Sequence, residues 1–353
     1  MRKIIIALTI IITTLASTVT VAAQQPPTLT VNQAVNRAMA NSERLREMFE
    51  DALLTDIEAR QIRERLRLPP ALSFEGHLSN VVQLMRNDIS RAFQHTERTA
   101  QRTQVTHSIQ SLFLAIIDAE TSLKFMDRQL RIDRQNLNFD RIRHEHGLIS
   151  EVDYTAARNN FEIEQLRRER LEEEINRAYR ALIEVVGGNP NARFTIELEL
   201  DFQPLGNRPV EDYVAIALAQ SASLRRQQRE LSVTQYQIEA SPRFSQDERI
   251  IDEITLTQAE RSLQSSRDFL RDTIINLYDQ IIDSERSLTE QRIRYEAMYT
   301  ELAINEVQLE LGRMTQMEFD AFVLRMDESR DNIRRTQNNH TLNVQRLRTP
   351  SLH

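Results

Sequence analysis

Apolar residues recur at alternating steps of four and three along a stretch in the first half of the chain. They are Val105, Ile109, Leu112, Ile116, Ala119, Leu123, Met126 and Leu130, and the pattern skips Asp133 and resumes at Leu137. This spacing is typical of the seam of a coiled coil. Neither Pro nor Gly interrupts the stretch before Gly147. We therefore predict a helix from about Val105 to Glu145, roughly 60 Å long at 1.5 Å per residue.

The second half of the chain carries the same pattern. Its seam positions are Leu270, Ile274, Leu277, Ile281, Ser284, Leu288, Tyr295, Met298, Leu302 and Leu309, and Gly312 ends it. One shift of 165 positions aligns residues 112–120 with 277–285 and also Gly147 with Gly312. Chance similarity between two coiled coils rarely keeps two motifs in one register. We predict a tandem duplication, in which each half contains a helix, a connection, a long helix, a tight turn and a return helix.

The first helix of the chain is predicted from its cap and its stop signal. Thr30 followed by Gln33 forms a capping box, and the helix should run to about Leu66, before Pro69-Pro70. A helix should resume at about Leu78 and merge into the long seam, with or without a break. Four seam positions are polar: Asp133, Ser284, Gln291 and Asn305. These residues either set the register of the helices or face a lumen.

The return helix of the first half is predicted over Glu151–Val186. Ser150 is its expected N-cap, and the run from Gly187 to Pro190 is a clear stop. One face of this helix carries Val152, Ala156, Asn159, Ile163 and Leu166. Apolar and polar residues then alternate at 194–200, which predicts one short strand.

Composition agrees with an elongated, all-α protein. The 353 residues include only 6 Gly and no Cys, 27% are charged, and the formal net charge is −7. Arg and Glu interleave, which argues against a nucleic-acid surface. No catalytic constellation or cofactor motif is present, so we expect a protein that is not an enzyme. His144 and His146 lie two positions apart on a helix and cannot share a metal ion.

The N-terminus is typical of a secretory signal peptide. Arg2 and Lys3 precede the apolar run 4–12, and small residues end at Ala23. An uncleaved membrane anchor fits less well, because this apolar run is short. We therefore expect a signal peptide at 1–23, a first repeat at 24–190, a connecting segment with a short strand at 191–208, and a second repeat at 209–348.

Several short motifs, in this order, resemble the TolC-type outer-membrane efflux protein family. The family's opening pattern is similar to LTVNQAVNRAMAN (Leu29–Asn41). Its hairpin tips are similar to GLISEVDYTAA (147–157) and GRMTQMEFDA (312–321), and its first repeat ends at a position similar to Gly187-Gly188. The resemblance covers nearly the whole chain after residue 23.

The resemblance implies a homotrimer that forms a hollow α-barrel in the cell envelope. A periplasmic adaptor (membrane-fusion) protein would dock at the hairpin tips, and an inner-membrane pump would feed the tunnel. The implied docking residues are Gly147, Leu148, Ser150, Gly312, Met314 and Thr315, although turns and caps need the same residue types. Asp153 and Glu318 would either ring the lumen near its entrance or only cap their helices.

The chain departs from the family between the first and second helices of each half. Family members insert membrane-spanning strands there, and each strand needs roughly 9–11 residues. The connections at 69–77 and 241–246 are too short for such strands. We therefore expect a variant that lacks the transmembrane barrel, which leaves its attachment to a membrane open. The alternative function is a non-conducting coiled-coil scaffold or spacer of the envelope.

Overall fold

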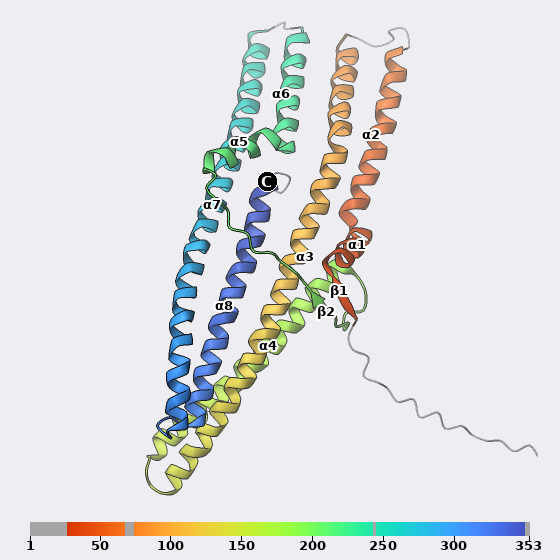
Figure 1. Cartoon of the computed structure of the whole chain (residues 1–353). Coiled ribbons are helices and arrows are strands. Elements are labelled where there is room, and N and C mark those ends of the chain that lie inside the picture. The colour runs from red at the N-terminus through yellow and green to blue at the C-terminus, as the bar shows by residue number, and fades with distance from the viewer. Residues whose placement is uncertain (1–26, 68–73, 243–244, 350–353) are drawn as a thin grey trace, which may run out of the picture.

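The computed structural model describes residues 27–67, 74–242 and 245–349, and these residues are almost entirely helical. In chain order the elements are β1 (Thr28–Thr30), α1 (Val31–Asn41), α2 (Glu43–Arg67), α3 (Phe74–Glu145), α4 (Glu151–Val186), β2 (Thr195–Glu197), α5 (Val210–Gln220), α6 (Ala222–Ala240), α7 (Gln246–Glu310) and α8 (Gln316–Arg348). The all-α, elongated fold class is confirmed (Figure 1). The expected signal peptide lies outside the described residues, as do 68–73 and 243–244 in the two connections.

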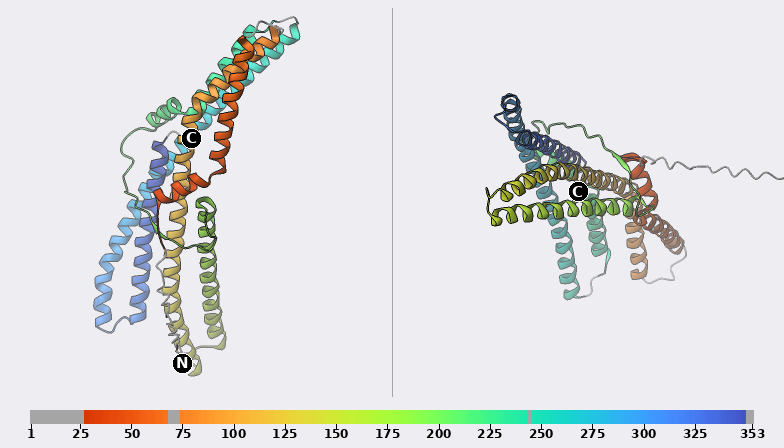
Figure 2. Two further views of the ribbon diagram at one scale, coloured as in Figure 1. Left: turned by 90° about the vertical axis from the view of Figure 1, so that its right-hand side faces the viewer. Right: turned by 90° about the horizontal axis from the view of Figure 1, so that it is seen from below.

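Two long helices run through the whole molecule. Helix α3 has 72 residues and α7 has 65, which corresponds to about 108 Å and about 98 Å. Helices α2 and α6 pack beside their upper parts, and α4 and α8 pack beside their lower parts (Figure 1). In the lower half the helices therefore lie in the order α7, α8, α3, α4 (Figure 2). The turns at Gly147 and Gly312 lie at the same end of the molecule.

The long seams are buried as their spacing predicts. Ile109 and Ile116 of α3 and Ile274 and Ile281 of α7 are fully buried. Helix α3 is continuous from Phe74, so no break separates its upper part from the predicted seam. Within the described residues, no helix contains a stretch that is long and apolar enough to cross a membrane.

The prediction of one continuous helix from Thr30 to Leu66 is wrong at Ser42. The backbone of Ser42 is extended, and its hydroxyl accepts a hydrogen bond from the Leu45 N–H, so α2 begins as a new helix. Ser221 breaks α5 from α6 in the same way and accepts from the Leu224 N–H. A Ser hydroxyl offers the backbone an alternative to helical hydrogen bonds, which explains both breaks.

A small parallel sheet closes the end of the first hairpin. The predicted strand is confirmed at its centre as β2, and it pairs with β1, with Leu29 opposite Ile196. The partner strand could not be predicted, because its three residues are too few to show an alternating pattern. The capping box of Thr30 and Gln33 is confirmed at the start of α1.

Two polar seam residues lie inside the second hairpin. Gln291 on α7 donates a 3.2 Å hydrogen bond to the Thr336 hydroxyl on α8, and Asn305 is 5% exposed. At these two positions the seam therefore places polar groups between the paired helices.

Candidate functional site at the hairpin tips

The first tip is a tight turn that depends on Gly147. Its φ of +70° lies in the left-handed region, which side chains other than Gly rarely adopt. The Gly147 N–H donates to the His144 carbonyl (2.8 Å), and the Leu148 N–H donates to the Arg143 carbonyl (2.7 Å). These bonds satisfy two of the last carbonyls of α3, so the turn is well defined.

Ser150 caps α4 as predicted. Its hydroxyl oxygen accepts from the Asp153 N–H at 3.1 Å, and the hydroxyl donates to Asp153 Oδ2 at 2.7 Å. Asp153 therefore stabilises the N-terminus of α4, where a negative charge complements the helix dipole. Its carboxylate remains exposed to solvent.

The second tip repeats this design. Gly312 has a φ of +66°, and Thr315 forms a full capping box with Glu318. Glu318 Oε2 accepts from the Thr315 N–H (2.8 Å) and the Thr315 hydroxyl (2.9 Å), and these hydrogen bonds lower the pKa of the carboxyl. The ionised Glu318 carboxylate therefore stabilises the folded protein at neutral pH, and this contribution is lost as the pH falls through its lowered pKa.

The two tips differ in the apolar residue that they expose. Leu148 is 69% exposed, as a docking residue would be. Met314 is only half-buried rather than fully exposed, and Arg313 takes the place of Leu148 in the second turn. Met314 directly precedes an N-cap, a position from which an apolar side chain commonly packs on the first turn of the helix.

The structure gives His144 a contact across the first tip. Its Nε2 lies 2.9 Å from Glu151 Oε2, and its ring stacks on Tyr154 with centroids 5.3 Å apart. Both partners belong to α4, so His144 joins the two arms of the hairpin. In the described ranges, no group of His, Asp or Glu side chains is arranged to hold a metal ion.

An ion-pair network joins the two hairpins, and the sequence did not reveal it. Arg334 on α8 lies 3.1 Å from Asp118 on α3 and 2.7 Å from Asp331. Arg335 lies 2.6 Å from Asp331 and also donates to the Ser122 hydroxyl and the Asp118 carbonyl. The only signal in the sequence is a pair of adjacent Arg residues among many other charges, which does not identify a partner.

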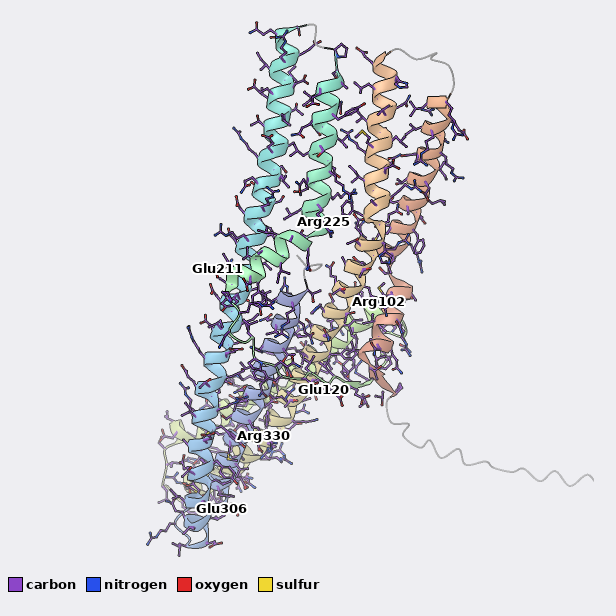
Figure 3. All side chains as sticks on the ribbon, turned by 45° about the horizontal axis from the view of Figure 1, so that its top comes forward. Arg102, Glu120, Glu211, Arg225, Glu306 and Arg330 are labelled. Carbon is purple, nitrogen blue, oxygen red and sulfur yellow. The ribbon has the colours of Figure 1, made fainter. Side chains whose placement is uncertain are left out.

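The start of the connecting segment is bound to the first hairpin through Tyr179. The Tyr179 hydroxyl lies within donating distance of two acceptors, Glu120 Oε1 (2.8 Å) and the Phe194 carbonyl oxygen (2.9 Å), and its single proton serves one of them at a time. Burial and the adjacent Glu120 carboxylate raise the pKa of Tyr179 well above its usual value. Glu120 lies on α3 in the middle of the molecule (Figure 3).

The end of the connecting segment is bound to the second hairpin through Glu285. Glu285 Oε1 accepts from the Leu205 N–H at 2.7 Å and lies 2.9 Å from His340 Nε2. His340 is fully buried on α8, with the Phe202 ring 4.8 Å away. The alignment of the two halves contains both Glu residues, but it does not show what they bind.

Comparison with known proteins identifies the fold. No family model matches the sequence, and no curated protein matches it. Among solved structures, the chain is similar to the outer membrane protein VceC from Vibrio cholerae (14% identity, TM-score 0.57, covering 91% of this chain and 94% of that one). It is similar to the Campylobacter jejuni CmeC outer membrane channel (11% identity, TM-score 0.59, covering 91% of this chain and 85% of that one). It is also similar to the open state of the Neisseria gonorrhoeae MtrE outer membrane channel (12% identity, TM-score 0.51, covering 89% of this chain and 88% of that one).

These similarities extend over about nine-tenths of the chain, so they include both hairpins and the segment between them. At such low sequence identity they establish the fold. The resemblance read from the short motifs is confirmed at this level. The chain has the fold of the TolC-type outer-membrane efflux channels.

Proposed function

We propose that the chain is one subunit of a homotrimeric α-helical tunnel of the cell envelope, which serves efflux or secretion. The observation that carries the proposal is the pair of long hairpins that lie side by side with both tips at one end (Figure 2). A layer of four helices is far too narrow to enclose a lumen by itself. Several copies side by side would form a wall, and the channel fold supports this arrangement.

The hairpin tips are the proposed docking surface for a periplasmic adaptor protein, and an inner-membrane pump would supply the substrate. Leu148 supports this role, because it is a large apolar side chain held in solvent at the end of a rigid turn. Met314 would contribute from its half-buried position. Gly147, Ser150, Gly312 and Thr315 would act by holding the turns in shape.

The assembly is tested by measuring the mass of the protein in solution and by negative-stain imaging. We expect a trimer with a hollow, elongated profile. A stable monomer or a solid rod would contradict the tunnel and would support the alternative function of a scaffold or spacer.

Adaptor docking is tested by pull-down with the double variant Leu148→Asp and Met314→Asp. We expect this variant to lose the adaptor. Tyr236→Asp is the matched control, because Tyr236 is an exposed apolar residue on α6, in the half of the molecule away from the tips. Equal capture of the double variant and the wild type would contradict the docking surface.

The proposed acidic ring is tested by single-channel conductance. Asp153→Asn and Glu318→Gln remove two negative charges per subunit but keep oxygen atoms that can accept the capping hydrogen bonds. If these carboxylates line the entrance, the preference for cations should fall in the double variant. Unchanged selectivity would limit both residues to capping their helices.

A further inference from the structure

The His144 ring at the end of α3 lies between two oxygen acceptors of the first tip. Its Nε2 is 2.9 Å from Glu151 Oε2, and its Nδ1 is 3.5 Å from the Ile149 carbonyl oxygen. Glu151 is the first residue of α4, and Ile149 lies in the turn. The ring therefore connects one arm of the hairpin both to the turn and to the other arm. Its side chain is 31% exposed, so protons from solvent can reach it.

The number of protons on this ring decides how many of these contacts are hydrogen bonds. A neutral imidazole has one N–H, and an ionised carboxylate can only accept. The proton of the neutral ring therefore belongs on Nε2, beside Glu151, and Nδ1 then directs a lone pair at the Ile149 carbonyl oxygen. A protonated ring donates from both nitrogens and also forms an ion pair with Glu151. The arrangement therefore fits the charged ring better than the neutral one.

Two further contacts hold the ring and its carboxylate partner in place. The Thr155 hydroxyl donates to Glu151 Oε1 at 3.2 Å, which leaves Oε2 for His144. The Tyr154 ring lies nearly parallel to the His144 ring, with an interplanar angle of 5°. Stacking of this kind restricts the orientation of a ring. The Glu151 side chain is 72% exposed, so water weakens the ion pair and its effect is modest.

The remaining charged or titratable residues within one helical turn of these contacts are Asp140, Arg141, Arg143, Glu145, His146, Asp153 and Arg158. The three carboxylates among them are bonded to other groups. Asp140 is 3.6 Å from Arg143, and Glu145 is 2.7 Å from Arg141. Asp153 accepts from the Ser150 hydroxyl. Glu151 is therefore the carboxylate that responds to the charge of His144.

The second tip has the same backbone design without these ionisable groups. The Gly312 N–H donates to the Leu309 carbonyl (2.9 Å), as the Gly147 N–H donates to the His144 carbonyl (2.8 Å). The shift of 165 positions therefore aligns the tips residue by residue. It places Leu309, Gln316 and Phe319 at the positions of His144, Glu151 and Tyr154. A charge that changes near neutral pH is thus built into the first tip and not into its counterpart.

We propose that protonation of His144 clamps the first hairpin tip, so that the tip is held more firmly in mildly acidic than in neutral solution. The clamp consists of the bonds from the ring to Glu151 and Ile149. A His side chain changes its charge between about pH 5 and pH 8. Both bonds and the ion pair are present while the ring is protonated, and the clamp weakens as the pH rises through this range.

The clamp would regulate the proposed docking surface, and in this respect the inference rests on the proposed function. Leu148, the exposed apolar residue of the tip, directly precedes Ile149, whose carbonyl oxygen the protonated ring binds. A turn that is already fixed loses less freedom when a partner binds to it. We therefore expect the adaptor to bind more tightly in mildly acidic solution.

Hydrogen exchange of the full-length protein, followed by mass spectrometry, tests the clamp without any adaptor. Exchange is measured at about pH 5.5 and about pH 7.5, on either side of the usual His range, and is corrected for the chemical rate at each pH. Peptides that cover 148–155 report the first tip. Peptides that cover 313–320 report the second tip in the same sample and serve as the reference.

We expect the first tip to be about two- to fivefold better protected at the lower pH, as a partly exposed ion pair allows. The second tip should show no such difference. His144→Leu introduces the residue that the second tip has and should abolish the difference, and Glu151→Gln should reduce it. His146→Leu is the matched control, because His146 is exposed in the same turn. This control should keep the difference.

Three results would overturn the clamp. They are an equal response of the two tips to pH, a response that survives in His144→Leu, and a response that is lost in His146→Leu. An unchanged circular dichroism spectrum verifies that each variant is folded.

Adaptor binding at the same two pH values separates the clamp from the proposed function. Comparison of the wild type with His144→Leu cancels any titration of the adaptor itself. If exchange shows the clamp but the adaptor binds at neither pH, the clamp stands and the docking surface is wrong. If the adaptor binds and neither exchange nor binding depends on His144, the docking surface stands and the clamp is wrong. A response in exchange with equal binding by the wild type and His144→Leu would overturn the regulation of docking.

Discussion

Glu120 contacts the start of the segment that connects the two halves of the chain through Tyr179, and Glu285 binds the end of that segment directly. Glu120 Oε1 and the Phe194 carbonyl oxygen are the two acceptors within reach of the Tyr179 hydroxyl, at 2.8 Å and 2.9 Å. Glu285 Oε1 accepts directly from the Leu205 N–H at 2.7 Å. The shift of 165 positions that aligns the two long helices also aligns these two residues. Both hairpins therefore place a Glu at the same level of their long helix, one beside the tyrosine that contacts the connecting segment and one bonded to the segment itself.

We expect Glu285→Ala to destabilise the protein by about 1–3 kcal/mol. The substitution removes the acceptor of the Leu205 N–H and of His340, and a buried donor without an acceptor is costly. Urea unfolding, followed by circular dichroism, measures the effect. Glu285→Gln is the matched control, because its amide oxygen can still accept one of these bonds and should recover part of the loss. An unchanged midpoint for Glu285→Ala would contradict the role of this residue.

The Tyr179 hydroxyl should stay protonated at a pH at which ordinary tyrosines ionise. Burial and the Glu120 carboxylate disfavour the phenolate, so the pKa is higher in the folded state than in the unfolded state. The protonated Tyr179 hydroxyl therefore contributes fully to the stability of the fold below the usual Tyr pKa of about 10. This contribution is lost as the pH rises from there through the raised pKa of the folded state. Ultraviolet absorbance should show one late ionisation step that is absent in Tyr179→Phe. A step that persists in Tyr179→Phe would assign it to another residue.

Arg335→Ala should weaken the junction of the two hairpins. Arg335 is bonded to Asp331, Asp118 and Ser122, and the Asp331 side chain is only 9% exposed. Its loss should cost about 1–3 kcal/mol, because part of the Asp331 charge is left unpaired. Arg286→Ala is the control. Arg286 forms an ion pair with Asp283 in which both side chains are more than 70% exposed, and its loss should cost less than about 0.5 kcal/mol. Equal unfolding midpoints for the two variants would contradict a network that holds the hairpins together.

Gly187→Ala should destabilise the protein more than Gly147→Ala. Both glycines have a positive φ, so each substitution introduces backbone strain of about 1–3 kcal/mol. At Gly147 an added Cβ meets no atom, whereas at Gly187 it collides with the Asn41 side chain. That side chain donates to the Val186 carbonyl and joins α1 to the end of α4. Thermal unfolding of the two variants measures the difference. A larger loss at Gly147 would contradict this account.

The sequence by itself determined the elements whose signals are local. The spacing of the two seams, the capping box at Thr30, the N-cap at Ser150 and the turns at Gly147 and Gly312 are signals that act within a few residues of each other. The end of α3 at Glu145 and the bounds of α4 could therefore be predicted well. The short motifs also identified the fold, because their order along the chain is specific even though each motif alone is weak.

Local sequence patterns predicted the structure less well where a helical and an extended backbone are both favourable. Ser42 and Ser221 lie in stretches whose periodicity favours a helix, but their hydroxyls satisfy the backbone in an extended conformation. Strand β1 has only three residues, and its pairing with β2 joins positions that are more than 160 residues apart in the chain. A short stretch of sequence never contains both strands, so their pairing cannot be predicted from local patterns.

Only the tertiary structure decided which of the periodic faces are buried. The face of α4 that begins at Val152 has the same spacing as a buried seam, yet it is exposed to solvent because α3 already packs on another face of α4. The partners that Glu120, Glu285 and Arg335 have in other elements likewise lie between 55 and 217 residues away in the chain. Helical periodicity specifies which residues share a face. Which face meets another helix depends on the packing of all the helices together, and that information is distributed over the whole chain.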